Sequence, residues 1–251
     1  MSAPSADIYL INLNIEDKTL QAELSLLNAE EQAQAQRYLF PHLRRRHIAV
    51  HSALRRILAR YTGDDPQALQ IAKGTYGKPY LPRHRRLAFN LSHSGDWALL
   101  GISAGPPESA PVKLGIDLEY YRSSTSFAKI SERHFTASER ASLPPVQSPK
   151  YPQEFLRLWT RKEAVTKCLG TGLRTPLRDF SAPLNRDPAQ VEWHTPQTTA
   201  SLTVQNIDVS RIIPPADEPC CLASLCSDRG ALEYRIIIYG DAPPFSKSAN
   251  S

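Results

Sequence analysis

The chain has 251 residues, of which 41% are hydrophobic and 22% are charged, as is typical of a globular protein with a sizeable core. No stretch approaches the roughly 20 apolar residues that span a bilayer, and residues 1–10 lack the basic start and apolar run of a signal peptide. Four cysteines without paired CxxC spacing argue against structural zinc and indicate reduced thiols. These features predict a cytoplasmic protein that does not contact membranes.

Lysine and arginine outnumber the acidic residues by 30 to 25, and the excess is concentrated at residues 44–46, 55–56 and 83–86. Such clusters suit a polyanionic ligand or an acidic partner, although a solvated surface is the commoner reason for any single cluster. Aromatic residues make up only 8% of the chain, and no zinc-finger or RNP1-like pattern occurs. We therefore expect no binding to nucleic acid.

The first part of the chain predicts a strand, two helices and a hairpin. Residues 8–13 are a candidate strand, and Asn28 is a suitable N-cap for the helix that follows. A helix over residues 44–61 has an apolar stripe and is closed by Gly63. The remaining predicted elements are a short strand at 69–73, a loop at 74–79 and a hairpin over 88–103.

A segment rich in proline and glycine at 104–111 is the predicted linker, and it divides the chain into halves of residues 1–108 and 109–251. The second half predicts a strand at 114–120, a capping box at 136–139 and a long helix between Pro152 and Gly170. Later strands are clearest at 221–225 and 234–239, and the tail from about residue 241 is expected to be disordered. Each half has a long helix that ends in glycine, which hints at duplication.

Two pairs of charged residues suggest chemistry. Asp117 and Glu119 are two positions apart on a predicted strand, so that both side chains leave the same face. Two such carboxylates repel each other unless a cation lies between them, and oxygen ligands of this kind suit Mg²⁺. Glu163 and Lys167 lie one helical turn apart, beside a glycine where the backbone could approach a phosphate. A solvated strand face and a surface ion pair are the commoner reasons for these two spacings.

Lys78, Ser92, His93 and Lys167 are candidate donors to phosphate groups. A lone histidine such as His93 more often has a structural role. Ser92 and His93 are not expected to form a catalytic pair, because neighbours on a strand point to opposite faces. The sequence contains no GxSxG motif, no Walker loop and no convincing GxGxxG motif.

Several short motifs follow one another in order. They are Gly-Lys-Pro at 77–79, Phe-Asn-Leu-Ser-His-Ser at 89–94, Gly-Ile-Asp-Leu-Glu at 115–119, Trp-Thr-Arg-Lys-Glu-Ala at 159–164 and Gly-Thr-Gly-Leu at 170–173. In this order they resemble the Sfp-type 4′-phosphopantetheinyl transferases, and the resemblance extends over residues 37–180.

The resemblance implies an α+β pseudo-dimer of two similar halves, with coenzyme A bound in the cleft between them. It also implies a reaction that depends on Mg²⁺, with Mn²⁺ expected to substitute. Phosphopantetheine passes from coenzyme A to a serine of an apo acyl or peptidyl carrier protein, and adenosine 3′,5′-bisphosphate is released. A monomer is expected. The carrier protein and its pathway, and the role of the extension after residue 180, stay open.

The motifs also carry residue roles. By resemblance, the metal carboxylates are Asp117, Glu119 and Glu163, and the groups that bind coenzyme A are Arg46, Lys78, Ser92, His93 and Lys167. Lys78 and one arginine of residues 44–46 are expected to bind the adenosine end. Arg46 is chosen by its distance from the helix core, with Arg45 as the next candidate and Arg44 as the third. Glu163 is the expected base, directly or through a metal-bound water. The alternative is a module that binds coenzyme A or a nucleotide without chemistry.

Overall fold

The computed structural model describes residues 5–104, 112–121, 126–194, 199–210, 212–213 and 221–239. The elements of the first half are β1 (Ser5–Asn12), α1 (Asp17–Ser25), α2 (Ala29–Gln36), α3 (Pro41–Thr62), β2 (Ala72–Lys73), β3 (Pro79–Tyr80), β4 (Leu87–Ser94) and β5 (Trp97–Ala104). The capping box predicted at Asn28 is confirmed, and the long helix α3 begins three residues earlier than predicted because Pro41 occupies its first turn. Gly63 ends α3 in the left-handed conformation, with φ of 75°.

The second half contains one long helix among shorter elements. These are β6 (Leu114–Tyr120), α4 (Phe127–His134), α5 (Ala137–Ser142), α6 (Tyr151–Leu169), the 3₁₀ turns η1 (Gly172–Arg174) and η2 (Leu177–Asp179), β7 (Ala189–His194), β8 (Thr199–Ile207), β9 (Cys221–Ser227) and β10 (Glu233–Ile238). The strand predicted at 114–120 is confirmed, and the capping box at Thr136 starts α5. The helix α4 was not predicted.

Two four-stranded sheets make up the centre of the molecule, with strand orders β10-β1-β5-β4 and β6-β9-β8-β7. The last strand, β10, runs parallel to β1 and so returns to the first sheet, whereas the prediction grouped it with the second half. The predicted boundary at residue 108 and the tail from residue 241 lie outside the described residues.

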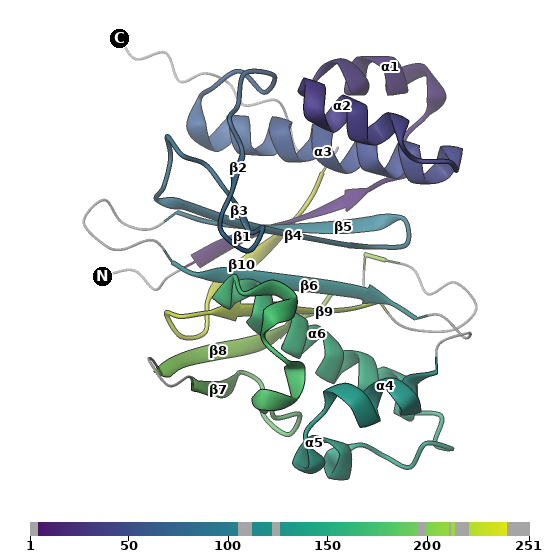
Figure 1. Ribbon diagram of the computed structural model, residues 1–251, viewed down its shortest axis with the longest axis vertical. Coiled ribbons are helices and arrows are strands. Elements are labelled where there is room, and N and C mark those ends of the chain that lie inside the picture. The colour runs from purple at the N-terminus through teal and green to yellow at the C-terminus, as the bar shows by residue number, and fades with distance from the viewer. Residues whose placement is uncertain are drawn as a thin grey trace.

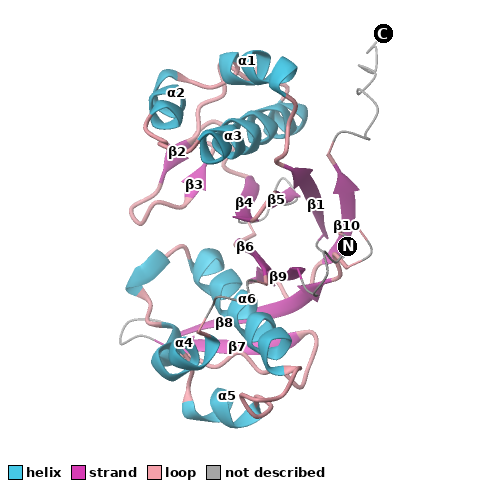
Figure 2. Ribbon diagram, turned by 90° about the vertical axis from the view of Figure 1, so that its right-hand side faces the viewer, coloured by secondary structure: helices cyan, strands magenta, loops and turns pink. Residues whose placement is uncertain are grey.

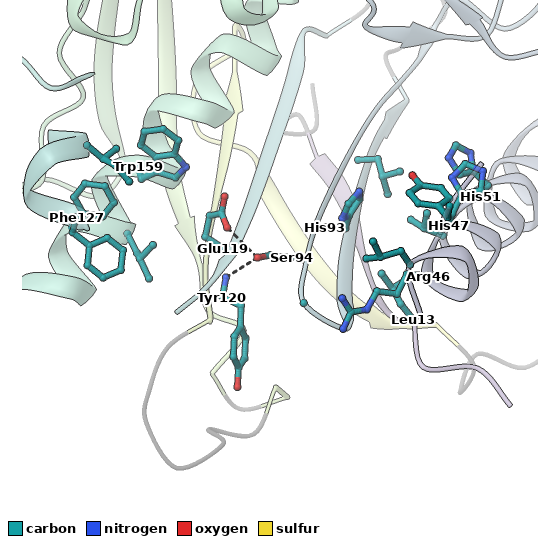
Figure 3. A pocket seen from close by; sticks show the side chains of 18 residues that line it. Leu13, Arg46, His47, His51, His93, Ser94, Glu119, Tyr120, Phe127 and Trp159 are labelled. Carbon is teal, nitrogen blue, oxygen red and sulfur yellow. Dashed lines mark hydrogen bonds between the residues drawn. The ribbon is translucent and has the colours of Figure 1, made fainter. Parts of the chain in front are cut away.

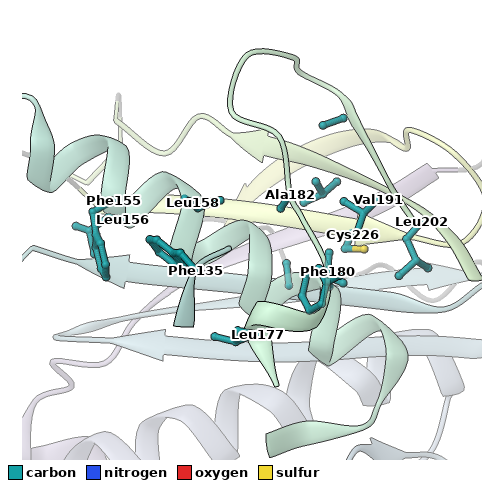
Figure 4. Packing of buried hydrophobic residues seen from close by; sticks show 14 of the residues in the cluster. Phe135, Phe155, Leu156, Leu158, Leu177, Phe180, Ala182, Val191, Leu202 and Cys226 are labelled. Carbon is teal, nitrogen blue, oxygen red and sulfur yellow. The ribbon is translucent and has the colours of Figure 1, made fainter. Parts of the chain in front are cut away.

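The sheets are sandwiched between helices, so that the protein has an α+β architecture of two halves (Figure 1; Figure 2). One face of the first sheet packs on α3 through residues such as Tyr9 and Ile57. Its other face packs on the second sheet, where Ile8 and Ile116 are fully buried. The helix α6 covers the far face of the second sheet (Figure 4). None of the helices in the described ranges combines the length and apolar character that crossing a membrane requires.

Candidate active site

The two halves meet along β4 and β6, which are the edge strands of their sheets. Backbone amides on the free edge of a strand need partners, and here side chains of β4 supply them. The amides of Ile116, Leu118 and Tyr120 donate to Asn90 Oδ1, Ser92 Oγ and Ser94 Oγ, at 2.8, 3.3 and 3.1 Å. Because the three polar residues alternate along β4, they all face β6. We call this row of contacts the β4–β6 seam.

The same serines orient the two carboxylates of β6. Ser92 Oγ donates to Asp117 Oδ1 at 2.9 Å. Ser94 Oγ donates to Glu119 Oε2 at 3.0 Å, as Figure 3 shows. Each hydroxyl therefore accepts from the backbone of β6 while it donates to a side chain of β6. The seam fixes both the strand and its acidic groups.

The helix α6 brings a cation to this point. Lys167 Nζ lies 2.6 Å from Asp117 Oδ1 and 2.9 Å from Ser92 Oγ. Such closeness requires α6 to touch the backbone of β6, and Gly115 permits it: a Cβ atom at this position would lie 2.0 Å from the carbonyl oxygen of Ala164. The glycine of the Gly-Ile-Asp-Leu-Glu motif is thus needed for packing.

The pKa values of all three predicted metal carboxylates are raised. Burial is the largest cause for each of them. The negative charge of Asp117 raises the pKa values of Glu119 and Glu163 further, which places the three groups within electrostatic reach of one another. Lys167 opposes the effect of burial on Asp117 without cancelling it.

A hard divalent cation fits this set of donors. Asp117 Oδ2 is buried and has no hydrogen-bond partner among the described residues, and a cation would relieve the repulsion between the carboxylates. Across the described ranges, no three His, Cys, Asp or Glu side chains are already arranged as ligands of one ion. In this structure Asp117 pairs with Lys167 instead.

A cleft of about 600 Å³ opens beside the seam, between the two halves (Figure 3). One wall carries Arg46 and the histidines at positions 47, 51 and 93. The opposite wall carries Glu119 and aromatic side chains, among them Phe127 and Trp159. An elongated ligand with charged and apolar parts would suit these two walls.

The basic wall is organised around Arg46 and His93. Arg46 pairs with Asp96 in the β4–β5 turn, where its Nε lies 2.8 Å from Oδ1. Surrounding protein atoms and the charge of Lys167 lower the pKa of His93, and Arg46 adds to the effect. His93 therefore lies within electrostatic reach of both cations, and this group of basic residues would attract anionic ligands.

The structure brings most of the predicted site residues together. Asp117, Glu119, Lys167 and Ser92 meet at the seam, and Glu163 lies within electrostatic reach of them. Arg46 and His93 line the cleft. Of the three candidate arginines, Arg45 pairs with Asp17 and Arg44 is exposed.

Lys78 is placed differently. It is not among the side chains that line the cleft, and its Nζ donates to two main-chain carbonyls, Leu114 O at 2.8 Å and Cys168 O at 3.1 Å.

Sequence reasoning missed several residues on which the site depends. Asn90 and Ser94 belong to the seam, and the alternation of polar residues on a predicted strand was a usable signal for them. In the Trp-Thr-Arg-Lys-Glu-Ala motif, Arg161 and Lys162 are fully buried. Lys162 Nζ lies 2.6 and 2.8 Å from the oxygens of Glu139, and the Arg161 side chain bonds to Asn206. These two cations hold the fold, and nothing in their spacing distinguishes them from site residues.

Comparison with known proteins agrees with this geometry. Residues 14–104 match the N-terminal 4′-phosphopantetheinyl transferase family, and residues 113–223 match the 4′-phosphopantetheinyl transferase superfamily. A 4′-phosphopantetheinyl transferase of Bacillus pumilus is 30% identical over 79% of this chain and 83% of its own length. The transferase HetI of Nostoc sp. is 33% identical over 66% of this chain and 69% of its own.

The 4′-phosphopantetheinyl transferase Sfp of Bacillus subtilis is 26% identical over 74% of this chain and 79% of its own. The two family matches fall on the two halves of the structure, on either side of the β4–β6 seam. The chain belongs to the Sfp-type 4′-phosphopantetheinyl transferases.

Proposed function

We propose that this protein transfers the 4′-phosphopantetheine group from coenzyme A to a serine of an apo carrier protein and releases adenosine 3′,5′-bisphosphate. The observation that carries the proposal is the grouping of Lys167 with three carboxylates of raised pKa, one of which, Glu119, lines a cleft whose other wall is basic. Cations suit the phosphates of coenzyme A, and the acidic cluster suits a reaction at the diphosphate.

Residues of both halves bind the substrate in this proposal. Lys167 holds the diphosphate, with Ser92 and His93 beside it, and Arg46 takes the adenosine end, where its pairing with Asp96 keeps it extended along the wall. Arg46 and His93 come from the first half and Lys167 from the second, so substrate binding depends on how the halves are joined.

Asp117, Glu119 and Glu163 would hold Mg²⁺, and Mn²⁺ would substitute because both ions prefer oxygen ligands. Such an ion supplies positive charge that offsets the charge of the diphosphate. The orphaned Asp117 Oδ2 supports this assignment.

The proposed reaction forms one bond and breaks another. The serine oxygen of the carrier protein bonds to the β-phosphorus of coenzyme A, and the bond from that phosphorus to the adenosine bisphosphate breaks. A base must take the serine proton, and Glu163 is the candidate among this chain's residues: burial and the neighbouring charge of Asp117 raise its pKa above the ordinary value. Lys167 neutralises charge on the departing group, and the seam keeps the acidic residues in place.

The surface beyond Trp159 suits an acidic carrier protein. An opening of about 550 Å³ is lined by Glu163 and Lys167 together with Arg133, His134 and Arg178. Arg133 and Arg178 are exposed, and neither forms an ion pair with a carboxylate in the ranges that the structure describes. Reversing the charge with Arg133→Glu should raise KM for the carrier protein and leave KM for coenzyme A unchanged. An equal rise in both would contradict this docking surface.

Two simpler roles are less favoured. A module that only binds coenzyme A would not need three repelling carboxylates beside the diphosphate site. Nucleic-acid binding would leave the acidic cluster unexplained. Transfer to a carrier protein accounts for both the basic wall and the acidic cluster, and we propose that the protein acts as a cytoplasmic monomer.

The test is incubation of the protein with coenzyme A, Mg²⁺ and a panel of apo acyl and peptidyl carriers, followed by mass spectrometry. At least one carrier should gain a single phosphopantetheine, and excess EDTA should prevent the gain. Full activity in EDTA would overturn the metal assignment, and coenzyme A binding without transfer to any carrier would favour the binding module.

A further inference from the structure

Lys78 joins the two halves and is not among the side chains that line the cleft. It precedes β3 in the first half, and both acceptors of its ammonium, Leu114 O and Cys168 O, belong to the second half. The side chain is half-buried, and burial lowers its pKa. Because the ammonium donates to both Leu114 O and Cys168 O, two of its three N–H groups are already used in hydrogen bonds to the main chain.

The two acceptors lie next to the reactive pair. Cys168 directly follows Lys167 in the last turn of α6, where carbonyls lack helical partners and a cation is favourable. Leu114 lies at the start of β6, three residues before Asp117. Its carbonyl points to the same edge of β6 as the amides of the β4–β6 seam, because backbone groups two residues apart face the same side. The hydrogen bond from Lys78 to Leu114 O thus adds one more contact to the edge of β6 that forms the β4–β6 seam, and the bond to Cys168 O connects the same ammonium to α6.

The surrounding packing leaves little freedom. A Cβ atom at Gly170 would lie 3.1 Å from Lys78 Cδ, so the end of α6 rests on the lysine stem. The guanidinium of Arg174 lies 5.0 Å from the centre of the Tyr76 ring, on the loop that carries Lys78. This loop and the exit of α6 are therefore in contact at more than one place.

We propose that Lys78 is a positioning residue of the transfer site: its ammonium ties the start of β6 to the last turn of α6 and thereby sets the position of Lys167 against Asp117. The proposal rests on the role given to Lys167 above. It replaces the expected contact of Lys78 with the adenosine end, because the ammonium is turned toward the main chain of the second half.

The test compares Lys78→Met, which keeps the stem and removes the ammonium, with Lys73→Met. Lys73 is a matched control, since it lies on the same hairpin, is exposed, and comes no closer than 3.6 Å to Glu30. Single-turnover transfer is measured with coenzyme A and with 3′-dephospho-coenzyme A, well below the unfolding midpoint of each variant. Hydrogen exchange is measured on the amides of α6.

Lys78→Met should lower the turnover rate about tenfold or more with both substrates. Its preference for coenzyme A over the dephospho analogue should stay within about twofold of the wild type, because no phosphate contact is lost. Exchange in the last turn of α6 should accelerate, and Lys73→Met should change nothing. Lys78→Arg, which keeps the charge and the donors, should have an intermediate rate and serves as the test variant if Lys78→Met does not fold.

Two results would overturn the proposal. Loss of the preference for coenzyme A, with the dephospho rate intact, would place Lys78 at the adenosine end. If Lys78→Met lowered the unfolding midpoint but left the turnover rate unchanged, Lys78 would stabilise the fold without positioning the transfer site. If the wild type transfers nothing, the proposed function fails, while the exchange measurement still decides whether Lys78 ties α6 to β6.

Discussion

Replacing Lys162 by methionine should destabilise the protein strongly and leave its chemistry intact. Lys162 Nζ donates to both oxygens of Glu139, at 2.6 and 2.8 Å, and to the carbonyl of Phe180 at 2.6 Å. The exposed fractions of the two charged side chains are 0% and 4%. Removing Lys162 leaves the buried charge of Glu139 with only two backbone amides, those of Thr136 and Ala182, as donors. Breaking a buried pair in this way costs about 3–5 kcal/mol.

For a chain of this size, 1 kcal/mol lowers the melting temperature by about 2–4 °C, so Lys162→Met should melt roughly 6–20 °C below the wild type. Circular dichroism during heating measures the shift. The matched variant Lys162→Met with Glu139→Gln removes both charges and should recover a large part of the loss. Coenzyme A binding by Lys162→Met should be unchanged at a temperature where it is folded.

A loss of less than about 1 kcal/mol would refute the reasoning, since only an exposed pair contributes so little. Loss of coenzyme A binding by the folded variant would also refute it, because Lys162 would then belong to the substrate site.

Three further predictions concern acid stability and the substrate. Burial raises the pKa of Glu31, but the hydrogen bond from Arg55, the nearby His51 ring at 3.5 Å and the Asn28 amide outweigh burial and lower this pKa from 4.5 to about 2. The stability that this lowered pKa contributes is present above pH 4.5 and is lost as the pH falls toward 2. After allowance for partial exposure, the free energy of unfolding of the wild type should fall by about 2 kcal/mol relative to Glu31→Gln across this range, as measured by urea titration. A constant difference would contradict this. Arg46→Ala should erase a preference of about tenfold for coenzyme A over its 3′-dephospho analogue, measured by calorimetry with Arg45→Ala as the control, and equal weakening of both ligands would count against the assignment. Lys167→Ala should lower single-turnover transfer by more than it weakens coenzyme A binding, because charge on the leaving group grows in the transition state; equal losses would mean that Lys167 only anchors the substrate.

Local signals in the sequence were sufficient for the main elements of the fold. Capping boxes at Asn28 and Thr136 start helices, and the glycines at positions 63 and 170 end them, because these features depend on neighbouring residues alone. The return of β10 to the first sheet depends instead on pairing with β1 across most of the chain length, which no local pattern encodes.

The same distinction applies to the site. Asp117 and Glu119 share a strand face, as their spacing predicted, and the fixed order of the motifs led to the family. Lys78 and Lys162 show where such reasoning ends, because a lysine in a motif looks the same whether its ammonium faces a ligand or a buried acceptor. Only the positions of Leu114 O and Glu139 distinguish these cases, and those positions are set by tertiary packing.

The most direct test of the transfer reaction follows both products of a single turnover. Protein in excess over apo carrier is mixed with coenzyme A and Mg²⁺, and holo carrier and adenosine 3′,5′-bisphosphate are quantified in the same samples. The two products should appear together in equal amounts for the wild type, and neither should appear for Asp117→Asn, which keeps the size of the side chain but removes its charge. Release of the bisphosphate without holo carrier, or equal activity of Asp117→Asn, would contradict the proposed site.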